Sequence, residues 1–436
     1  MHFYELPLIF VLVGLALYVV LAGADFGAGF WQLLAGPGRM GERIRDHAHE
    51  AMAPVWEANH VWLIFVLTVT WTAYPSAFAA IASTLSIPLF IAAIGIIMRG
   101  ASYALRAGTA TAGERRRVDL VFALSSVLTP FALGTIVGGI ASQRVPVGNA
   151  AGDRFSSWLN PTSIMVGVLA VATSAYLAAV FLAADAGRSS IGRVASADGS
   201  EDDLLAALRV RALVTGLVSG AIAFAGLIVL HSDAHFLYTR LLHGGALAAV
   251  IVSALAGLVT LELVRRSTFE LARYTAALAV AGVLAGWALA QRPLLLKGLT
   301  VQQGAAPHDT LVLVVIAVLA GATILFPSLA LLFRLVLQGR LDHGEPHAAG
   351  APAAAQQRSE LGQLLAASAA GLLARAAGAG LLAGFGFLTI AEAGWAHAIG
   401  VVALLGFLLC GFFAVVPSQL ADFAREERAD AVGGER

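Results

Sequence analysis

Three polar side chains that could carry or pass on a proton stand close together early in the chain. Glu57, Asn59 and His60 lie within four residues of one another, at the start of an apolar run (63–73) that otherwise suits lipid. On a helix, Glu57 and His60 are three residues apart and share a face. A carboxyl group inside a bilayer is costly unless it is paired, protonated or turned towards a protein interior. The stretch therefore predicts either a proton-carrying site or a polar cluster that packs helices together.

The composition indicates what surrounds this stretch. Of 436 residues, 59% are hydrophobic and 12% are charged, whereas soluble domains carry roughly 25% charged residues. We therefore expect a polytopic, all-α membrane protein. The formal net charge is zero, so nothing indicates a nucleic-acid partner. The single cysteine, Cys410, excludes a disulfide within the chain and a CxxCH haem-attachment motif.

Hydropathy predicts about 11 transmembrane helices, since each needs about 20 apolar residues to cross the bilayer. The expected spans are roughly 8–34, 51–74, 77–105, 118–142, 162–186, 208–231, 243–264, 270–290, 309–337, 373–393 and 396–418. Tyr74-Pro75 predicts a short turn between the second and third spans, because proline cannot donate a backbone hydrogen bond.

The distribution of basic residues predicts the orientation of these spans. The loops after the odd-numbered spans, together with the C-terminal tail, carry 20 Lys and Arg residues, and the remaining loops carry 5. Because cytoplasmic loops are enriched in Lys and Arg, we expect the N-terminus outside and the C-terminus in the cytoplasm.

The second half of the sequence divides at a segment rich in Ala, Pro, Gly, His and Gln. Residues 339–360 predict a flexible cytoplasmic linker. It separates a nine-span body from extra C-terminal helices (361–418) and a cytoplasmic tail (419–436). No internal repeat is evident at the level of individual residues.

Charged residues of the first four spans are expected to meet at one depth. The first span runs inward, so Asp25 lies about nine residues, or roughly 14 Å, from its inner end. Glu57 and His60 lie two to three turns into the second span, Arg99 lies near the inner end of the third, and Asp119 begins the fourth. Buried charges of both signs at one depth predict a paired network, since an isolated charge would be strongly destabilising.

Other candidate sites in the sequence are weaker. His231, His235 and His243 lie around Asp233 at the outer side; their spacing could suit a metal, but a solvated loop is the favoured interpretation. The small-residue run 23–29 predicts close helix packing. No Walker A, dinucleotide-binding or HExxH motif occurs. Helix interiors contain almost no histidine except His60, so the chain lacks an evident pair of axial haem ligands.

Several of these motifs, in this order, resemble subunit II of the cytochrome bd-type quinol oxidases, including the cyanide-insensitive branch. The Pro-x-Trp-acid-x-Asn-x-x-Trp string is the most specific part, and the resemblance covers roughly residues 5–340. It is carried by Gly23-Ala24-Asp25-Phe26-Gly27-Ala28-Gly29, Ala53-Pro54-Val55-Trp56-Glu57-Ala58-Asn59-His60-Val61-Trp62, Tyr74-Pro75, Met98-Arg99-Gly100 with Arg106, Asp119, Leu159-Asn160-Pro161, and Leu299-Thr300 with Ala306 to Leu311.

The resemblance implies a heterodimer in the bacterial plasma (inner) membrane. Its partner, subunit I, would bind two b-type haems and haem d, oxidise quinol at the outer face and reduce dioxygen to water. This chain would bind no haem itself, and would contribute stability, a bound quinone and a cytoplasmic proton route. The first eight helices would form two four-helix bundles (1–142 and 162–290), with a peripheral ninth (309–337).

The resemblance also implies roles for individual residues. Asp25, Glu57 and Asp119 match acidic positions attributed in the family to proton conduction or to a bound cation. This chain departs from the family pattern at Glu57, where Asp is common, at Ala22, where another acid is usual, and at His60, where Gln or Glu is common.

Together these features predict an accessory subunit of a terminal quinol oxidase, in contact with membrane lipids, quinone and subunit I. Two alternatives remain at this point: a proton-coupled secondary transporter, and a purely structural membrane subunit. The expected proton path comprises Glu57, Asp25, His60 and Asp119. The expected charge-partner or structural residues are Arg99, Asn59, Trp56 and Trp62.

Overall fold

The computed structural model describes residues 2–106, 108–109, 111–192, 200–337, 360–389 and 394–415. Within these ranges the side chains of residues 52–58, 112, 189–192, 200–202, 324–337, 360–371, 385, 388–389, 394, 397, 408 and 412–415 are not described. The predicted linker up to residue 359 and the predicted tail at 419–436 therefore lie outside the described residues.

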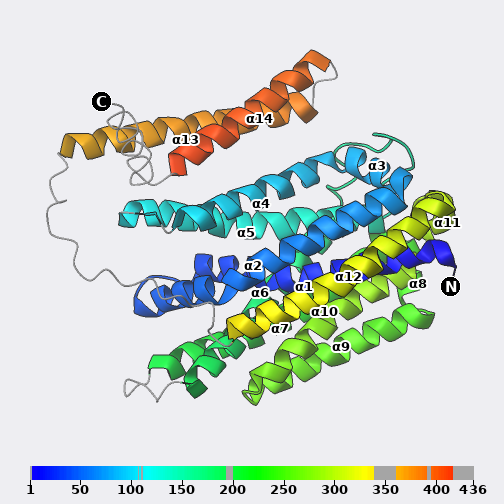
Figure 1. Cartoon of the computed structure of the whole chain (residues 1–436), viewed down its shortest axis with the longest axis horizontal. Coiled ribbons are helices and arrows are strands. Elements are labelled where there is room, and N and C mark those ends of the chain that lie inside the picture. The colour runs from blue at the N-terminus through cyan, green and yellow to red at the C-terminus, as the bar shows by residue number, and fades with distance from the viewer. Residues whose placement is uncertain are drawn as a thin grey trace. The chain divides into compact units, whose positions relative to one another are not determined.

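The described chain is mostly helical (Figure 1). A 3-10 turn, Phe3–Glu5, precedes the first helix. The helices are α1 (Leu6–Leu34), α2 (Arg39–Ala73), α3 (Pro75–Thr84), α4 (Ser86–Arg106), α5 (Ala112–Ala141), α6 (Pro161–Gly192), α7 (Ser200–Asp233), α8 (His235–Leu241), α9 (Gly244–Arg265), α10 (Phe269–Gln291), α11 (Val301–Gly304), α12 (His308–Leu337), α13 (Glu360–Thr389) and α14 (Gly394–Val415).

Within the described residues, seven helices are long and apolar enough to cross a membrane, or eight if one bent pair is counted as a span. These seven candidate spans lie in α1, α4, α5, α6, α7, α9 and α10. The helices α12, α13 and α14 contribute shorter apolar stretches, His308–Thr323, Leu372–Gly384 and Ala398–Gly411. A polytopic, mostly helical membrane protein is thus confirmed, and the count of 11 spans stays a prediction.

The bent pair forms at the predicted Tyr74-Pro75 turn. The helix α2 ends at Ala73, α3 begins at Pro75, and the two axes differ by 120°. The Tyr74 hydroxyl donates to the main-chain oxygen of Tyr4 at 2.7 Å, which ties the bend to the start of α1.

The span expected at 77–105 is not a single helix, because the structure divides this segment at Leu85 into α3 and α4. Pro88 has no N–H to donate to the carbonyl four residues earlier, which explains why the helix is interrupted here.

Small residues set the distance between neighbouring helices, as the run at 23–29 predicts. The helix α1 packs against both α2 and α6 (Figure 1). A Cβ atom at Gly27 would collide with the main chain of Ser174 on α6, and one at Gly23 would lie 2.7 Å from the Leu177 side chain. Buried alanines of α1, α6 and α10 continue this contact into the main apolar core.

A short antiparallel hairpin follows α10 and was not predicted from the sequence. Its strands are β1 (Leu294–Leu296) and β2 (Leu299–Thr300), with Leu294 opposite Thr300. Strands of three and two residues are too short to show an alternating pattern. The Thr300 side chain then caps α11 by accepting from the backbone N–H of Gln303.

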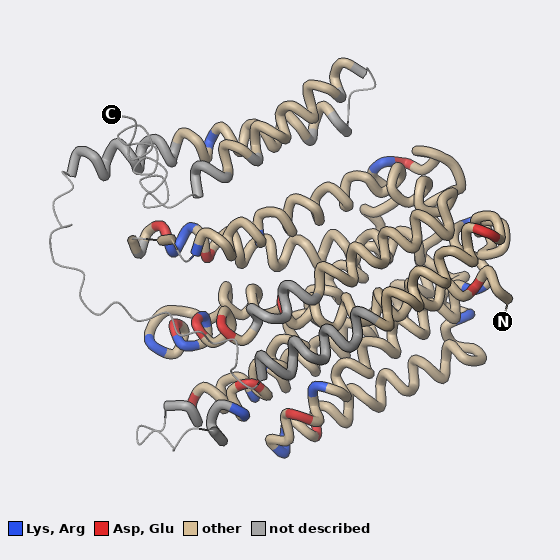
Figure 2. The backbone as a smooth tube through the Cα atoms, in the orientation of Figure 1, with Lys and Arg blue, Asp and Glu red and all other residues tan. Residues whose placement is uncertain are grey.

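Most charged residues lie near the ends of the helices, and the middle is mostly apolar (Figure 2). We call the end where α1 stops and α2 starts the arginine-rich end. In residues 1–100 and 119–314 it carries Arg39, Arg43, Arg45, Arg188, Arg209, Arg211, Arg265, Arg266 and Arg273, whereas the opposite end carries Arg144, Arg154, Arg240, Arg292 and Lys297.

The two C-terminal helices pack against each other as a helical hairpin. A Cβ atom at Gly380 of α13 would lie 2.8 Å from the main-chain oxygen of Ala403 on α14, and one at Gly384 would lie 2.6 Å from Leu404. Glycines therefore allow a close approach of the two backbones here as well.

Candidate functional site

A buried carboxylate on α1 is the centre of the candidate site. Asp25 has a relative exposure of only 2%. It shares a helix face with Gly29, four residues on. The missing side chain of Gly29 leaves room for Ser126 of α5 and Arg99 of α4, which both come close to this point. The glycine thus allows two other helices to bring polar groups to Asp25.

Arg99 binds Asp25 through three of its hydrogen-bond donors. Its Nη2 atom donates to Oδ1 of Asp25 at 2.5 Å and to the main-chain oxygen of Asp25 at 2.7 Å. Its Nε atom donates to Oδ2 at 3.2 Å. Arg99 itself has a relative exposure of 1%, so the ion pair is enclosed by this chain alone.

The rest of the guanidinium is also occupied. Its Nη1 atom donates to the hydroxyl of Ser126, which in turn donates to the main-chain oxygen of Phe122 at 2.5 Å. The guanidinium carbon lies 4.0 Å from the ring centroid of Phe122 and 5.2 Å from that of Phe26. Aromatic faces attract a desolvated cation, so these rings help to hold Arg99 inside the apolar interior.

Asn59 of α2 completes the group, which we call the Asp25 cluster (Asp25, Asn59, Arg99 and Ser126). Its Nδ2 atom donates to Oδ2 of Asp25 at 3.0 Å, and the residue is fully buried. Four helices therefore meet at one charge-neutral cluster. A guanidinium stays charged in proteins, and Asp25 is the acidic side chain that binds it here.

The other predicted site residues lie on the same helices as the cluster. The backbone of Glu57 and Trp56 belongs to α2, but their side chains lie outside the described part of the chain. His60 is half-buried next to Asn59, and Trp62 is buried with its ring edge-on to Phe65 at 5.9 Å.

Asp119 lies on α5, seven residues before Ser126 and on the same face. It is half-buried. The structure thus brings Asp25, Asn59 and Arg99 into direct contact and places Asp119 two helical turns further along one of the contributing helices. The roles predicted for Glu57, His60 and Asp119 stay predictions.

Sequence reasoning missed Ser126 and the two phenylalanine rings. The spacing of Ser126, seven residues after Asp119, was the available signal, because such spacing puts both side chains on one helix face. Nothing in the sequence singles out Phe26 or Phe122 from the many other apolar residues.

A cation was predicted at Asp25, Glu57 and Asp119. At Asp25 it would compete with Arg99, which already binds both carboxylate oxygens. Among the side chains that the structure describes, no group of three or more His, Cys, Asp or Glu could hold a metal ion. The cation also depends on Glu57, whose side chain is not described, and it stays a prediction.

At the opposite end, Asp233 binds residues other than the histidines around it. It accepts from Arg144 at 2.7 and 3.0 Å, and from the backbone N–H and hydroxyl of Thr162 at 3.1 and 2.6 Å. The arrangement ties the end of α7 to the start of α6. A metal held by Asp233 with the neighbouring histidines is therefore not what this geometry favours.

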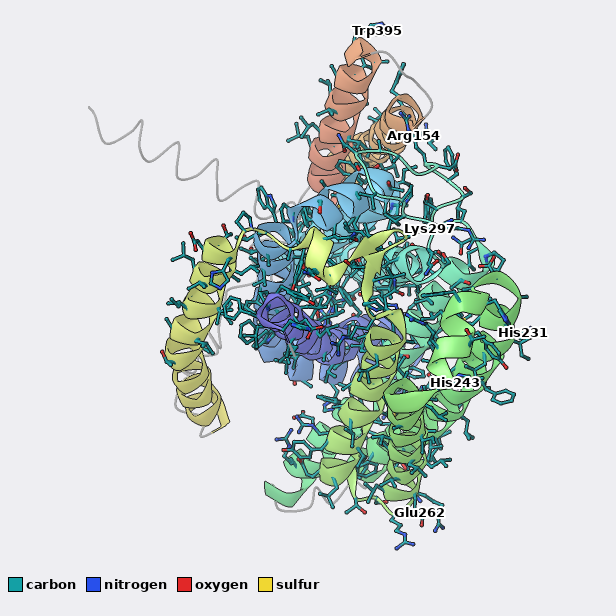
Figure 3. All side chains as sticks on the ribbon, turned by 90° about the vertical axis from the view of Figure 1, so that its right-hand side faces the viewer. Arg154, His231, His243, Glu262, Lys297 and Trp395 are labelled. Carbon is teal, nitrogen blue, oxygen red and sulfur yellow. The ribbon has the colours of Figure 1, made fainter. Side chains whose placement is uncertain are left out.

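His231 and His243 lie at the periphery (Figure 3). The His231 ring packs edge-on to His235 and Tyr238, at 5.4 and 5.0 Å between centroids. His243 follows α8 and is also exposed. Among the described side chains, His60 is the imidazole set in the apolar part of a helix, so the residues present do not offer two facing axial haem ligands.

An apolar cavity of about 350 Å³ lies among α1, α5, α6 and α7. Its lining includes a single hydroxyl, that of Thr215, and is otherwise hydrocarbon or aromatic. Such a cavity suits an acyl or isoprenoid chain. The other lining residues are Phe30, Val127, Phe131, Val168, Val171, Ala172, Ala175 and Val218.

Comparison with known proteins identifies relatives of this chain. The "Putative cytochrome bd menaquinol oxidase subunit II" of Bacillus subtilis is 23% identical over 248 residues, covering 56% of this chain and 67% of that protein. The "Cytochrome bd-I ubiquinol oxidase subunit 2" of Escherichia coli K12 is 26% identical over 169 residues, covering 37% of this chain and 44% of that protein.

A solved structure shares the fold. The bd oxidase structure from Geobacillus thermodenitrificans includes a chain that matches with a TM-score of 0.58 at 23% identity, covering 78% of this chain and 99% of that chain. The sequence model described as "Cytochrome bd terminal oxidase subunit II" matches residues 4–336. Because this match spans well over half of the sequence, the chain belongs to the cytochrome bd terminal oxidase subunit II family.

Proposed function

We propose that this chain is the accessory subunit of a bd-type terminal quinol oxidase. Family membership supports this directly, and the names of its relatives specify quinol as the reductant. Haem b and haem d would belong to a partner subunit I, since the described residues of this chain do not suit two axial ligands. The partner would transfer electrons from quinol to dioxygen, and this chain would stabilise it and supply a proton path.

The proposed topology has the arginine-rich end in the cytoplasm of a bacterial inner membrane. The asymmetry of arginines between the two ends supports this orientation (Figure 2). The N-terminus then lies outside, and the Asp25 cluster lies in the cytoplasmic half, because Asp25 is nine residues from the end of α1.

The proposed architecture retains two four-helix bundles, the first from α1, α2, α4 and α5 and the second from α6, α7, α9 and α10. Close pairs within each group support it, α1 with α2 and α9 with α10. The helix α1 also packs extensively on α6, so the bundles share a face. Three further spans from α12, α13 and α14 would bring the total to 11.

The Asp25 cluster is the observation that carries the proton-path proposal. Asn59 and Arg99 bind the Asp25 carboxylate, and Ser126 binds Arg99, so four helices contribute buried polar groups to one cluster. In the proposed topology this cluster lies in the cytoplasmic half of the membrane. Such groups in a membrane interior mark ion or proton pathways. Reduction of dioxygen consumes protons, and a route that opens to the cytoplasm would make the reaction electrogenic.

The geometry suggests a division of roles within this route. Asp25 fits a fixed counter-ion, since Arg99 and Asn59 together occupy its oxygens. Glu57, two residues before Asn59 on α2, would load and release the proton, with His60 and Asp119 as relays. This refines the prediction that Asp25 serves as relay or charge partner in favour of the charge partner.

The test compares Glu57→Gln with Glu57→Asp. Gln keeps the shape but cannot exchange a proton at working pH, so it should slow oxygen consumption and proton uptake per assembled haem. Asp keeps the ionisable group and should be milder. The matched control is Glu50→Gln on the same helix, where the side chain is exposed. Full activity of Glu57→Gln would refute the proton role and leave a structural subunit.

A secondary transporter remains the rival of a different class. Transporters favour inverted repeats with matching broken helices in both halves, whereas the 120° break lies in the first half of this chain. Purification in mild detergent separates the two: a partner with haem b and haem d absorption supports the oxidase, and a colourless lone chain supports the transporter.

A further inference from the structure

A buried amide on α1, that of Gln32, has no part in the Asp25 cluster. Gln32 has a relative exposure of 5%, yet neither its Nε2 nor its Oε1 atom meets a hydrogen-bond partner among the described residues. The Oδ1 atom of Asn59 likewise has no hydrogen-bond partner among the described residues. Buried amides nearly always bond to protein or to ordered water, so each of these two groups indicates a position for internal water.

Helix geometry places Gln32 beside the cluster. Asp25, Gly29 and Gln32 are spaced by four and three residues and share one face of α1. Gly29 in the middle of this face meets Ser126 and Arg99. Gln32 therefore lies three residues, about 4.5 Å, further towards the arginine-rich end than that contact.

The helix α5, which meets α1 at Gly29, carries a further polar residue towards the arginine-rich end. On α5, Asp119 lies seven residues from Ser126, roughly 10 Å along the axis, and also towards the arginine-rich end. Gln32 thus lies at a level between the Asp25 cluster and Asp119. This level is where a proton from the cytoplasm would have to pass to reach the cluster.

We propose that Gln32 holds a chain of water molecules that links the Asp119 level to Asn59 and the Asp25 cluster. The amide both donates and accepts, so it can fix a water without exchanging a proton itself. Each water in such a chain accepts one proton and passes one on, so no net charge remains behind. Gln32 is therefore a positioning residue, and its role rests on the proposed proton path.

The first experiment tests hydration without reference to activity. Cys410 is the single cysteine of the chain, so Cys410→Ala gives a background free of thiols in this subunit. Gln32→Cys and Ala28→Cys are then exposed to a small charged methanethiosulfonate in inside-out vesicles, and labelling is scored on this subunit. Ala28 is the matched control, since it lies one turn away on α1, is 1% exposed and packs in the apolar core.

Methanethiosulfonates react with thiolates, which form in water. The Gln32→Cys thiol should therefore be labelled at least tenfold faster than the Ala28→Cys thiol. Equal and slow labelling at both positions would overturn the proposal that water reaches Gln32.

The second experiment tests the role of that water. Gln32→Leu keeps the volume and removes both polar atoms, so proton uptake and oxygen turnover per haem should fall severalfold with haem content retained. Gln32→Ser leaves a hydroxyl and room for water, and should retain more activity than Gln32→Leu. Equal turnover of Gln32→Leu and the unaltered complex would overturn the positioning role.

The two proposals can fail separately. If Gln32→Cys is labelled quickly while Glu57→Gln is fully active, the hydration site stands and the proton path does not. If Glu57→Gln is inactive while Gln32→Cys resists labelling, the proton path stands and the water chain at Gln32 does not.

Discussion

Asp25 and Arg99 are 74 residues apart in the chain, on α1 and α4, and form an ion pair with an Nη2 to Oδ1 distance of 2.5 Å inside the protein. The side chains are 3% and 1% exposed. Taking two charges out of water costs several kcal/mol each, and mutual attraction offsets this cost only when the geometry is good. The pair therefore depends on both partners.

This dependence gives the first prediction. Arg99→Leu or Asp25→Leu alone leaves an uncompensated buried charge and should destabilise the assembled complex by about 3–5 kcal/mol. The double variant should lose much less than the sum of the two, because no buried charge remains. The measurement is the thermal midpoint and haem yield of the purified complex.

The exposed pair Arg188 and Glu270, 2.9 Å apart with side chains 40% and 49% exposed, is the control for this cycle. Its removal should cost only about 0–1 kcal/mol. Strictly additive losses for Asp25→Leu and Arg99→Leu would contradict the view that the two charges depend on each other.

Much of the fold could be predicted from the sequence because apolar runs long enough to cross a bilayer leave few alternatives. The ends of α1, α9 and α10 lie within two residues of the expected spans. Two details escaped prediction. The break at Leu85 depends on a single missing N–H, that of Pro88, in a run that remains apolar throughout. The hairpin after α10 is too short to show a period.

The candidate site was predictable in outline only. Charges of both signs at one depth implied an ion pair, and Asp25 with Arg99 is that pair. The sequence could not show which carboxylate Arg99 would bind, because Glu57 and Asp119 lie at similar depths. That choice depends on Gly29, which lets α4 and α5 approach α1 at the level of Asp25.

A second prediction concerns the close approach of α1 and α6. Gly27→Ala adds a Cβ where the main chain of Ser174 already lies, and overpacking of this kind typically costs about 1–3 kcal/mol. Gly220→Ala on α7 is the control, since nothing lies within 4 Å of its Cβ. That change should be neutral or slightly stabilising, by up to about 1 kcal/mol. The measurement is the thermal midpoint of each variant. An unchanged midpoint for Gly27→Ala would show that α1 and α6 can move apart to accommodate the added Cβ.

A third prediction concerns the contact between Asp233 and Arg144. Asp233→Ala removes four hydrogen bonds that tie the end of α7 to the start of α6 and to the preceding loop. We expect a loss of about 2–4 kcal/mol, because hydrogen bonds to charged groups each contribute about 1.5–3 kcal/mol and the remaining groups can partly reach water. Asp309→Asn, at a fully exposed carboxylate, should have no measurable effect on the thermal midpoint. If Asp233→Ala likewise leaves the thermal midpoint unchanged, packing alone holds these helix ends together.

A fourth prediction concerns pH at the loop before α6. The backbone N–H groups of Ser156 and Phe155 donate to Oδ1 of Asp153 at 2.7 and 3.0 Å and hold the pKa of this carboxyl below its usual value. A lowered pKa stabilises the turn above the unfolded-state pKa of about 3.9, and this contribution is lost as pH falls through the folded value. Amide exchange in a peptide covering 150–160 should thus keep the same protection from pH 8 to 6, once corrected for intrinsic rates. Asp153→Ala should raise exchange at every pH in that window, and protection that instead changes within it would contradict this assignment.

The last prediction concerns the C-terminal helices. The family match ends at residue 336, and α13 packs closely on α14 through Gly380 and Gly384. None of the residues of the Asp25 cluster comes from this part of the chain. We therefore expect that deletion of residues 345–436 leaves assembly with the haem-bearing subunit and most of the oxygen consumption per haem intact. The readouts are co-purification, the haem spectrum and quinol-driven turnover in membranes. Loss of co-purification with the truncated chain still present in the membrane would instead make the α13–α14 hairpin part of the subunit interface, because a hairpin that packs only on itself contributes nothing to binding the partner.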